Sequence, residues 1–421
     1  MPDINQFERF LSDDGPAALV IREHLMPVEG TDGVLFPATY AGGDTFPGGY
    51  NIDGEPTGTN VCLIDSVGSQ ANRIEPLFAG EKYRHLIPQI VVKAGEKEVN
   101  ILDAGHRAGD AIVRCSSLKE TIDAAFLASI KGDAEPLARI APTSLVFGVW
   151  NSRGAQGAQD KRPRLVASTI RAFNVRKLTR SAQFNPATEF VNDKLLDEPT
   201  DKATKDAYAE RGFIHVPASG SHGGVIATGG IRRDATLGLA ALRLLFAGKD
   251  PEKTTKLQRY ILGLALVAFT KNPSGYLRQG CLLVQDPAKA SENEFVEVHP
   301  SGKREGVTIS HEAALKYATA TAEAFGVAKG QTVPFDTARA KRDVTGGATS
   351  EGTIAGMITA IGAGGKNCTI KQGIQKIKVG LTDSTAYFKG DAASTIDEVV
   401  KKDVAVEVEV VDGKAVKVTA K

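Results

Sequence analysis

Basic side chains gather between Asn151 and Arg180, where eight lysine or arginine residues are opposed by a single acid, Asp160. The whole chain is nearly neutral, with 51 basic and 50 acidic residues. Concentrated positive charge attracts polyanions, and arginine, the commoner cation here, favours bidentate phosphate contacts and stacking on bases. The segment therefore predicts a nucleic-acid contact. Its cations are Arg153, Lys161, Arg162, Arg164, Arg171, Arg176, Lys177 and Arg180.

A helix is expected to present these charges, because Pro163 is well placed to open one. At helical spacing the segment divides into a polar and an apolar stripe. The polar stripe holds Arg164, Ser168 and Arg171. The apolar stripe holds Val166, Ile170 and Phe173. One face would be buried and the other would offer guanidinium groups. The alternative is a solvated surface helix whose charges pair with acids elsewhere in the fold.

Two further pairs of polar residues can contact the same ligand. Asn72 and Arg73 follow the apolar strand end Leu63–Asp65, in a stretch that either starts a helix aimed at a ligand or forms an ordinary amphipathic turn. Arg232 and Arg233 follow a glycine-rich loop, and the next residue, Asp234, is placed to cap a helix whose N-terminus can hold a phosphate. The alternative is that the second arginine and the aspartate belong to an internal ion-pair network.

Metal, cofactor and nucleotide chemistry find no support in the sequence. The four cysteines are scattered without zinc-ligand spacing, which predicts reduced structural thiols. The seven histidines form no HExxH motif. The stretch Gly364–Asn367 resembles a P-loop only superficially, because Ala360 stands where the first glycine belongs and no Ser or Thr follows the lysine. We therefore expect no cofactor, no metal and no nucleotide hydrolysis.

The composition is that of a folded protein, with 42% hydrophobic residues in 421. The most apolar run, Tyr260–Phe269, is too short to cross a membrane and predicts a buried core helix. The first residues lack the basic start and apolar core of a signal peptide. A cytoplasmic location without membrane partners is expected.

The local patterns mix helices and strands, which predicts an α+β core. Expected helices begin at Ser117 with a capping box, cover Thr254–Thr270, and run from the cap Ser310 to Gly326. Expected strands are Thr143–Trp150, Cys281–Val284, and the pair Phe213–Val216 with Val225–Thr228.

The composition changes near residue 345, because no arginine follows Arg342 and no proline follows Pro334. This predicts a core over residues 1–345 and a small OB- or SH3-like β domain over 346–421. A terminal hairpin is predicted by valines that alternate on both sides of the turn Asp412–Gly413. The alternating positions are Val404, Val406, Val408 and Val410 before the turn, and Val416 and Val418 after it.

Several of these segments together resemble the Cas-seven backbone subunit of type I-U (also called I-G) CRISPR interference complexes, of the RAMP superfamily. The motifs are LVFGVWNSRG, RPRL, TRSAQFNP, GGVIATGGIRRDATL and LRQGCLLV, spread over most of residues 60–285. The resemblance implies a modified RRM, or ferredoxin-like, palm with inserted finger and thumb elements. It does not extend to the predicted β-barrel-like domain after residue 345.

The resemblance further implies several copies aligned along one crRNA, with target DNA, contacted through the guide, and other CRISPR subunits as partners. The RNA-facing role falls on Asn72, Arg73, Arg153, Arg164, Arg171, Arg180, Arg232 and Arg233. A non-catalytic RNA-binding subunit is the leading interpretation. The alternative is a guide-directed RNA nuclease like the related subunits of type III complexes. Its candidate acids, Asp65, Asp103 and Asp110, form no paired metal-binding pattern.

Overall fold

The computed structural model describes residues 5–55, 59–151, 161–271, 275–344, 351–372, 375–411 and 414–420. The chain divides into two compact units. The first comprises Met1–Val91, Glu98–Asp110 and Glu120–Thr332, and the second comprises Val92–Lys97, Ala111–Lys119 and Val333–Lys421. Helices and strands are mixed along the chain, in agreement with the predicted α+β class.

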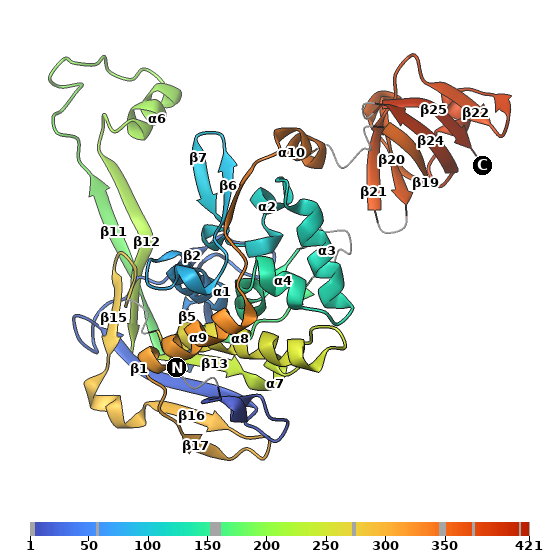
Figure 1. Ribbon diagram of the computed structural model, residues 1–421. Coiled ribbons are helices and arrows are strands. Elements are labelled where there is room, and N and C mark those ends of the chain that lie inside the picture. Colours follow the sequence, from blue (N-terminus) through green and yellow to red (C-terminus); the bar gives the residue numbers. More distant parts are fainter. Residues whose placement is uncertain are drawn as a thin grey trace. The chain divides into compact units, whose positions relative to one another are not determined.

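The first unit is built on an antiparallel sheet with the strand order β14-β15-β1-β13-β10-β5-β4, and β16 pairs with both β1 and β17. Figure 1 labels β15, β1, β13, β5, β16 and β17 of this sheet. Its strands are β1 (Ala18–Pro27), β4 (Ile52–Gly54), β5 (Asn60–Asp65), β10 (Val166–Phe173), β13 (Ile231–Gly238), β14 (Tyr276–Arg278), β15 (Cys281–Gln285), β16 (Glu294–Val298) and β17 (Arg304–Gly306). The predicted strand at Cys281–Val284 is confirmed as β15.

The two faces of this sheet differ in character, because successive side chains of a strand point to opposite sides. One face is apolar: Ile170 and Ala172 of β10 and Ile231 of β13 are each at most 3% exposed. The other face carries arginines, since Arg232 is opposite Arg171 across the β10–β13 pair. The sheet thus separates a core side from a polar side.

The α-helices within the described residues are α1 (Val67–Ile74), α2 (Ala111–Arg114), α3 (Lys119–Ile130), α4 (Glu135–Ile140), α5 (Thr143–Phe147), α6 (Lys202–Glu210), α7 (Leu239–Leu242), α8 (Pro251–Thr270), α9 (His311–Phe325), α10 (Thr337–Val344) and α11 (Ile396–Val399). The apolar run Tyr260–Phe269 is buried throughout in α8. None of the described helices is long and apolar enough to span a bilayer. The helix predicted between the cap Ser310 and Gly326 is confirmed as α9. Ser310 accepts the N-cap hydrogen bond, and Gly326 ends the helix with φ 74°.

The helix predicted after Pro163 is wrong, because residues Val166–Phe173 form strand β10. This strand pairs with β13 on one side and β5 on the other, and those pairings outweigh its helical spacing of apolar residues. The predicted strand at Thr143–Trp150 is also wrong over most of its length. It forms the short buried helix α5, which Gly148 ends with φ 76°, followed by the two-residue strand β8 (Val149–Trp150).

Two other predictions after residue 184 are wrong. The separate strands expected at Phe213–Val216 and Val225–Thr228 are replaced by one long strand, β12 (Val216–Ala227), which pairs with β11 (Val175–Phe184). The helix expected after Asp234 is wrong over its first residues, because β13 is paired on both edges and extends to Gly238; within the predicted stretch the short helix α7 forms at Leu239–Leu242. Asp234 is therefore a strand residue and caps no helix.

The second unit contains a closed β-barrel. Its strands are β19 (Glu351–Ile361), β20 (Asn367–Gln372), β21 (Gln375–Gly380), β22 (Ala386–Lys389), β23 (Ala392–Ala393), β24 (Ala405–Val411) and β25 (Lys414–Ala420). The order is β21-β20-β19-β24-β25-β22-β23, and Gly380 of β21 also pairs with Lys414 of β25, which closes a ring of five strands. All the residues of its buried core lie between Ile354 and Ala420.

The predicted terminal hairpin is confirmed as the antiparallel pair β24 and β25. Val406, Val408, Val410 and Val418 are buried as expected. Val416 is 42% exposed instead, because the register shifts between Glu409 and Val410 and breaks the alternation of β25. The remaining strands are β2 (Thr39–Tyr40), β3 (Gly49–Tyr50), β9 (Lys161–Arg162) and the sheet of β18 (Gln331–Pro334), β6 (Ile90–Ala94) and β7 (Lys97–Asn100).

Candidate nucleic-acid interface

A long β-hairpin, β11 with β12, extends away from the sheet of the first unit and carries α6 near its far end (Figure 1). We call the two strands the stalk and residues 185–215 the tip. In β11, Arg176, Lys177 and Arg180 are exposed. The strand sequences VRKLTRSAQF and VPASGSHGGVIA contain no Asp or Glu. The stalk therefore has an excess of positive charge that no acid within it offsets.

Tight packing anchors the stalk at its base. Gly224 adopts φ +94°, and a Cβ atom there would lie 2.5 Å from Val34 Cγ1 and 2.6 Å from the Leu35 carbonyl oxygen. The amide of Gly224 donates a hydrogen bond to the buried Tyr50 hydroxyl at 3.0 Å. Leu35 and Val225 exchange two backbone hydrogen bonds, of 2.7 and 2.9 Å. The close backbone approach that Gly224 permits is thus to Val34 and Leu35 of the same chain.

A second set of predicted contact residues lies in the chain segment around Trp150, the single tryptophan of the chain. Trp150 is 55% exposed. Strand β8 pairs with β9, and the Lys161 ammonium lies 6.0 Å from the centroid of the indole ring. Arg164 is exposed two residues after β9. An exposed aromatic ring with cations beside it suits base stacking combined with phosphate contact.

The other members of this predicted segment are placed differently. Arg162 is partly buried and lines a pocket with Leu145 and Leu165, so its side chain turns toward the protein. Arg153 lies outside the described residues.

Arg107 supports this region, and the sequence patterns did not identify it. Its backbone has φ 51°, its side chain is buried, and its Nε lies 2.5 Å from Glu75 Oε2. It donates hydrogen bonds of 3.2 Å to the Gly148 carbonyl and to Asn72 Oδ1. Burial raises the pKa of Glu75 to about 7, against the lowering effect of Arg107. Arg107 thus ties the end of α1, with Asn72, to the turn that precedes Trp150.

The open face of the sheet holds a pair of arginines. Arg232 lies opposite Arg171, and its guanidinium carbon is 4.9 Å from the centroid of the Phe173 ring. The Arg232 Nε donates to both carboxylate oxygens of Asp234, at 2.9 and 3.1 Å. Asp234 also lies 3.6 Å from Arg22. No acid among the described residues pairs with Arg171, and Arg22 and Arg232 share the Asp234 carboxylate, so these residues carry an excess of positive charge.

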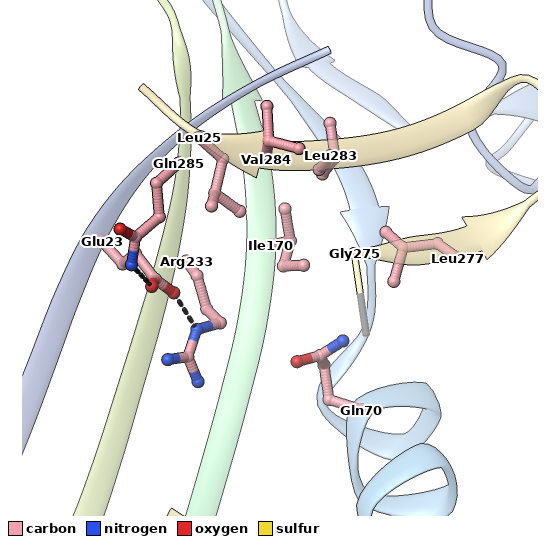
Figure 2. A pocket seen from close by; sticks show the side chains of 10 residues that line it. All are labelled: Glu23, Leu25, Gln70, Ile170, Arg233, Gly275, Leu277, Leu283, Val284 and Gln285. Carbon is pink, nitrogen blue, oxygen red and sulfur yellow. Dashed lines mark hydrogen bonds and ion pairs between the residues drawn. The ribbon is translucent and has the colours of Figure 1, made fainter. Parts of the chain in front are cut away.

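Arg233 lies on the opposite, core side of β13 and is 6% exposed. Its Nε donates to Glu23 Oε2 at 2.6 Å, and Gln285 donates to the other oxygen of Glu23 at 2.6 Å (Figure 2). These groups line a pocket of about 360 Å³ together with Gln70 and Ile170. Arg232 and Arg233 therefore form no joint anion site, and the internal ion-pair alternative describes Arg233.

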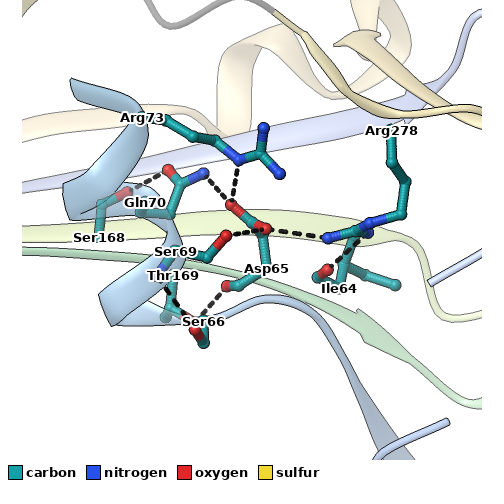
Figure 3. Close-up of polar contacts among 9 residues, drawn as sticks. All are labelled: Ile64, Asp65, Ser66, Ser69, Gln70, Arg73, Ser168, Thr169 and Arg278. Carbon is teal, nitrogen blue, oxygen red and sulfur yellow. Dashed lines mark hydrogen bonds and ion pairs between the residues drawn. The ribbon is translucent and has the colours of Figure 1, made fainter. Parts of the chain in front are cut away.

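Arg73 is held by a buried carboxylate, that of Asp65, whose side chain is 0% exposed. Arg73 and Arg278 each approach Asp65 at 3.1 Å (Figure 3). Ser69 and Gln70 donate the remaining hydrogen bonds to it, at 2.8 and 2.7 Å. Helix α1, capped by Ser66, positions these donors and confirms a helix rather than a turn around residue 72. Both oxygens of Asp65 are thus occupied by protein donors, and the cluster keeps one excess positive charge.

The four cysteines are free and buried, as predicted. Burial raises the pKa of the Cys62 thiol to about 12 and that of Cys281 to about 11, so both remain protonated and unreactive at neutral pH. Within the described part of the chain, no three His, Cys, Asp or Glu side chains are grouped as a metal site requires.

The predicted contact residues therefore fall into four groups. The stalk holds Arg176, Lys177 and Arg180. The Trp150 region holds Asn72, Lys161, Arg162 and Arg164. The open sheet face holds Arg171 and Arg232. Ion pairs with buried carboxylates hold Arg73 and Arg233.

Comparison with known protein families gives one match. A family model described as CRISPR-associated protein GSU0053 matches residues 19–177, from β1 through the Trp150 region to the first cations of the stalk. No curated protein matches the chain. The match covers less than half of the chain, and it supports a CRISPR-associated protein with a role in CRISPR defence.

Proposed function

We propose that the chain is a non-catalytic, crRNA-binding backbone subunit of a type I CRISPR interference complex. It polymerises along the guide RNA and supports the pairing of that guide with target DNA. The observation that carries the proposal is the stalk, a projecting hairpin with three exposed cations and no acid in either strand. A surface of this kind favours an extended polyanion over a small ligand.

The strand order supports the palm that the family resemblance implies. β15, β1, β13 and β10 are neighbours in that order, and every pair is antiparallel. Numbered along the chain, they give 4-1-3-2, the order of the ferredoxin-like fold. The stalk with its tip is then an insertion between the second and third strands of the palm, in the manner of a thumb.

RNA contacts on this chain are of two kinds. Cations of the stalk and Arg171 on the open sheet face bind phosphates, which gives affinity without sequence preference. Trp150 offers a ring on which one base stacks, and stacking tolerates any base. A subunit of this kind holds the guide by its backbone and leaves sequence reading to base pairing.

The contacts of Asp65 argue against one of the three candidate acids of the nuclease alternative, and Asp103, which is exposed, is left to experiment. A metal ion or an attacking water at Asp65 would have to displace Arg73, Arg278, Ser69 or Gln70 from a buried carboxylate. Cutting RNA needs an acid that is open to metal or water. Incubation of the assembled complex with complementary RNA and Mg²⁺ separates the two. Cleavage at regular intervals would identify a nuclease.

The stalk can be tested with two matched triple variants of the full chain. R176A/K177A/R180A removes three cations from the stalk, and K194A/K202A/K205A removes three exposed cations from the tip. We expect the stalk variant to bind single-stranded RNA at least tenfold more weakly at moderate salt, and its salt slope to fall by about 2, at roughly 0.7 per lost contact. The tip variant should bind nearly as the parent does. Equal losses in both would contradict the proposal.

A further inference from the structure

The barrel of the second unit has a strand order that points to a ligand class. Numbered along the barrel, β19, β20, β21, β24 and β25 close in the order 1-2-3-5-4-1. The third and fifth strands are parallel and the other pairs are antiparallel. This is the arrangement of the OB-fold, in which the face of the second and third strands binds oligonucleotides or oligosaccharides.

Charge on this barrel distinguishes the two ligand classes. Residues 352–382 include four lysines and no Asp or Glu. Cys368, Ile370, Ile377 and Val379 of β20 and β21 point into the core. Lys371 and Lys378 alternate with them and are exposed, and the cross-strand partner of Lys371 on β19 is Met357, 45% exposed. The outer face of β20 and β21 therefore carries ammonium groups, and exposed apolar surface lies beside it on β19.

The acids of the barrel lie on other strands. Glu407 and Glu409 alternate with the buried valines of β24, and Glu409 lies 3.6 Å from Lys417 of β25. Strand β24 is not a neighbour of β20 or β21 in the sheet. The barrel thus has a basic face on its second and third strands, whose sequences contain lysines but no Asp or Glu.

An aromatic side chain extends this face. Residues 346–421 contain two aromatic residues, Tyr387 and Phe388, both on β22. Tyr387 packs against the barrel core, and its neighbour Phe388 has the Lys417 ammonium 5.0 Å from its ring centroid. Strand β22 runs parallel to β25, as β21 does, and so continues the third strand. A ring with an adjacent cation at this position suits a stacked nucleobase.

We propose that the β20–β21 face of the barrel, with Phe388, is a second binding site for single-stranded nucleic acid. This site goes beyond the guide-binding role proposed for the first unit. Lys371 and Lys378 contact phosphates, and Phe388 stacks on a base. An OB-fold accommodates about 4–16 nucleotides. The segment bound is therefore a short stretch of single strand.

Photo-crosslinking on the full-length chain tests this site directly. The probe is a labelled single-stranded oligonucleotide of about eight nucleotides, within the range that one OB-fold binds, containing 5-bromouracil. Crosslinked peptides are identified by mass spectrometry. We expect crosslinks within residues 367–389, and their yield should fall at least tenfold in K371E/K378E. K401E/K402E changes the same charge at two exposed lysines outside these strands and should retain the crosslinks.

Two outcomes would overturn the proposal. One is the absence of crosslinks in residues 367–389 of the parent chain. The other is an equal loss in both double variants, which would indicate non-specific attraction. If this face binds another protein and gives no oligonucleotide crosslink, the proposal is likewise overturned. Guide RNA retention by the first unit is measured in the same preparations, and K371E/K378E should leave it unchanged, so failure of one proposal is separable from failure of the other.

Discussion

At the scale of single residues, the buried pair of Arg107 and Glu75 is a support rather than a contact. Its guanidinium joins Asn72, on α1, to the Gly148 carbonyl before Trp150. Neither Arg107 nor Glu75 belongs to a recognisable sequence motif. The role of Arg107 depends on a left-handed backbone and on contacts between distant segments, and sequence patterns report neither.

Replacing Arg107 by alanine should lower the free energy of unfolding by about 3–5 kcal/mol, because Glu75 loses its partner inside the protein. Urea denaturation measures this loss. The control is R107M/E75L, which removes both charges and should recover most of the stability. A loss below about 1 kcal/mol in R107A would show that the pair is not a support.

The loss in R107A should also depend on pH. Burial already raises the pKa of Glu75, and Arg107 is the main group that lowers it. Without Arg107 the folded pKa rises further, so the folded variant binds a proton that the unfolded chain releases. A group with a raised folded pKa contributes stability below its unfolded pKa and loses that contribution as pH increases. Because Glu75 of the parent already has a pKa of about 7, R107A should gain stability relative to the parent as the pH falls from the alkaline range to 7, and the difference between the two should change little from 7 down to 4.5.

At the scale of elements, the stalk depends on a backbone conformation at its base. Gly224→Ala places a methyl group within 2.6 Å of the Leu35 carbonyl oxygen at φ +94°. It should cost at least 1–3 kcal/mol of strain and weaken RNA binding by loosening the stalk. The matched control is Gly220→Ala in the same strand, where φ is +71° and a Cβ atom meets nothing within 4 Å. Thermal melts should separate the two variants, and identical melting temperatures would refute the anchoring role.

Sequence patterns predicted some helices closely and took parts of two strands, β10 and β13, for helices. Helix α9 was predicted from its cap Ser310 to Gly326, and the structure agrees. Helix α8 was predicted from Thr254, but it begins three residues earlier, at Pro251 after the cap Asp250. Strand β10 was predicted as a helix because its apolar residues recur at helical spacing, and only its partners β5 and β13 decide the matter. Because β13 is a strand, the side chains of Arg232 and Arg233 point to opposite faces of the sheet. The two adjacent arginines, which the sequence suggested as one anion site, therefore have separate surroundings.

At the scale of the whole molecule, the sheet of the first unit and the barrel of the second have separate core clusters and separate basic surfaces. The core of the first unit joins Cys62, Ile170 and Cys281, and the barrel core contains only residues after 353. The segment Asn151–Arg180 carries a net charge of +7, from eight basic residues and one acid. This charge belongs to the first unit and should dominate RNA affinity.

Binding of long single-stranded RNA should therefore weaken steeply with salt. If about six phosphates are neutralised per subunit, the logarithm of affinity should fall against the logarithm of salt concentration with a slope of about −4. A titration from low to moderate salt by fluorescence anisotropy measures the slope. It should be the same for RNAs of different sequence. A slope near zero would show that charge does not drive the binding.

The closed barrel also imposes an order on protein synthesis. Its first strand, β19, has β24 as one of its two neighbours, and the ring closes only when β25 meets β21. During translation one edge of β19 therefore stays unpaired until β24 has left the ribosome, and the ring stays open until β25 has left it. An unpaired edge of 11 residues invites association with other chains. Nascent chains stalled before β24 should thus recruit chaperones, and chains extended past β25 should release them.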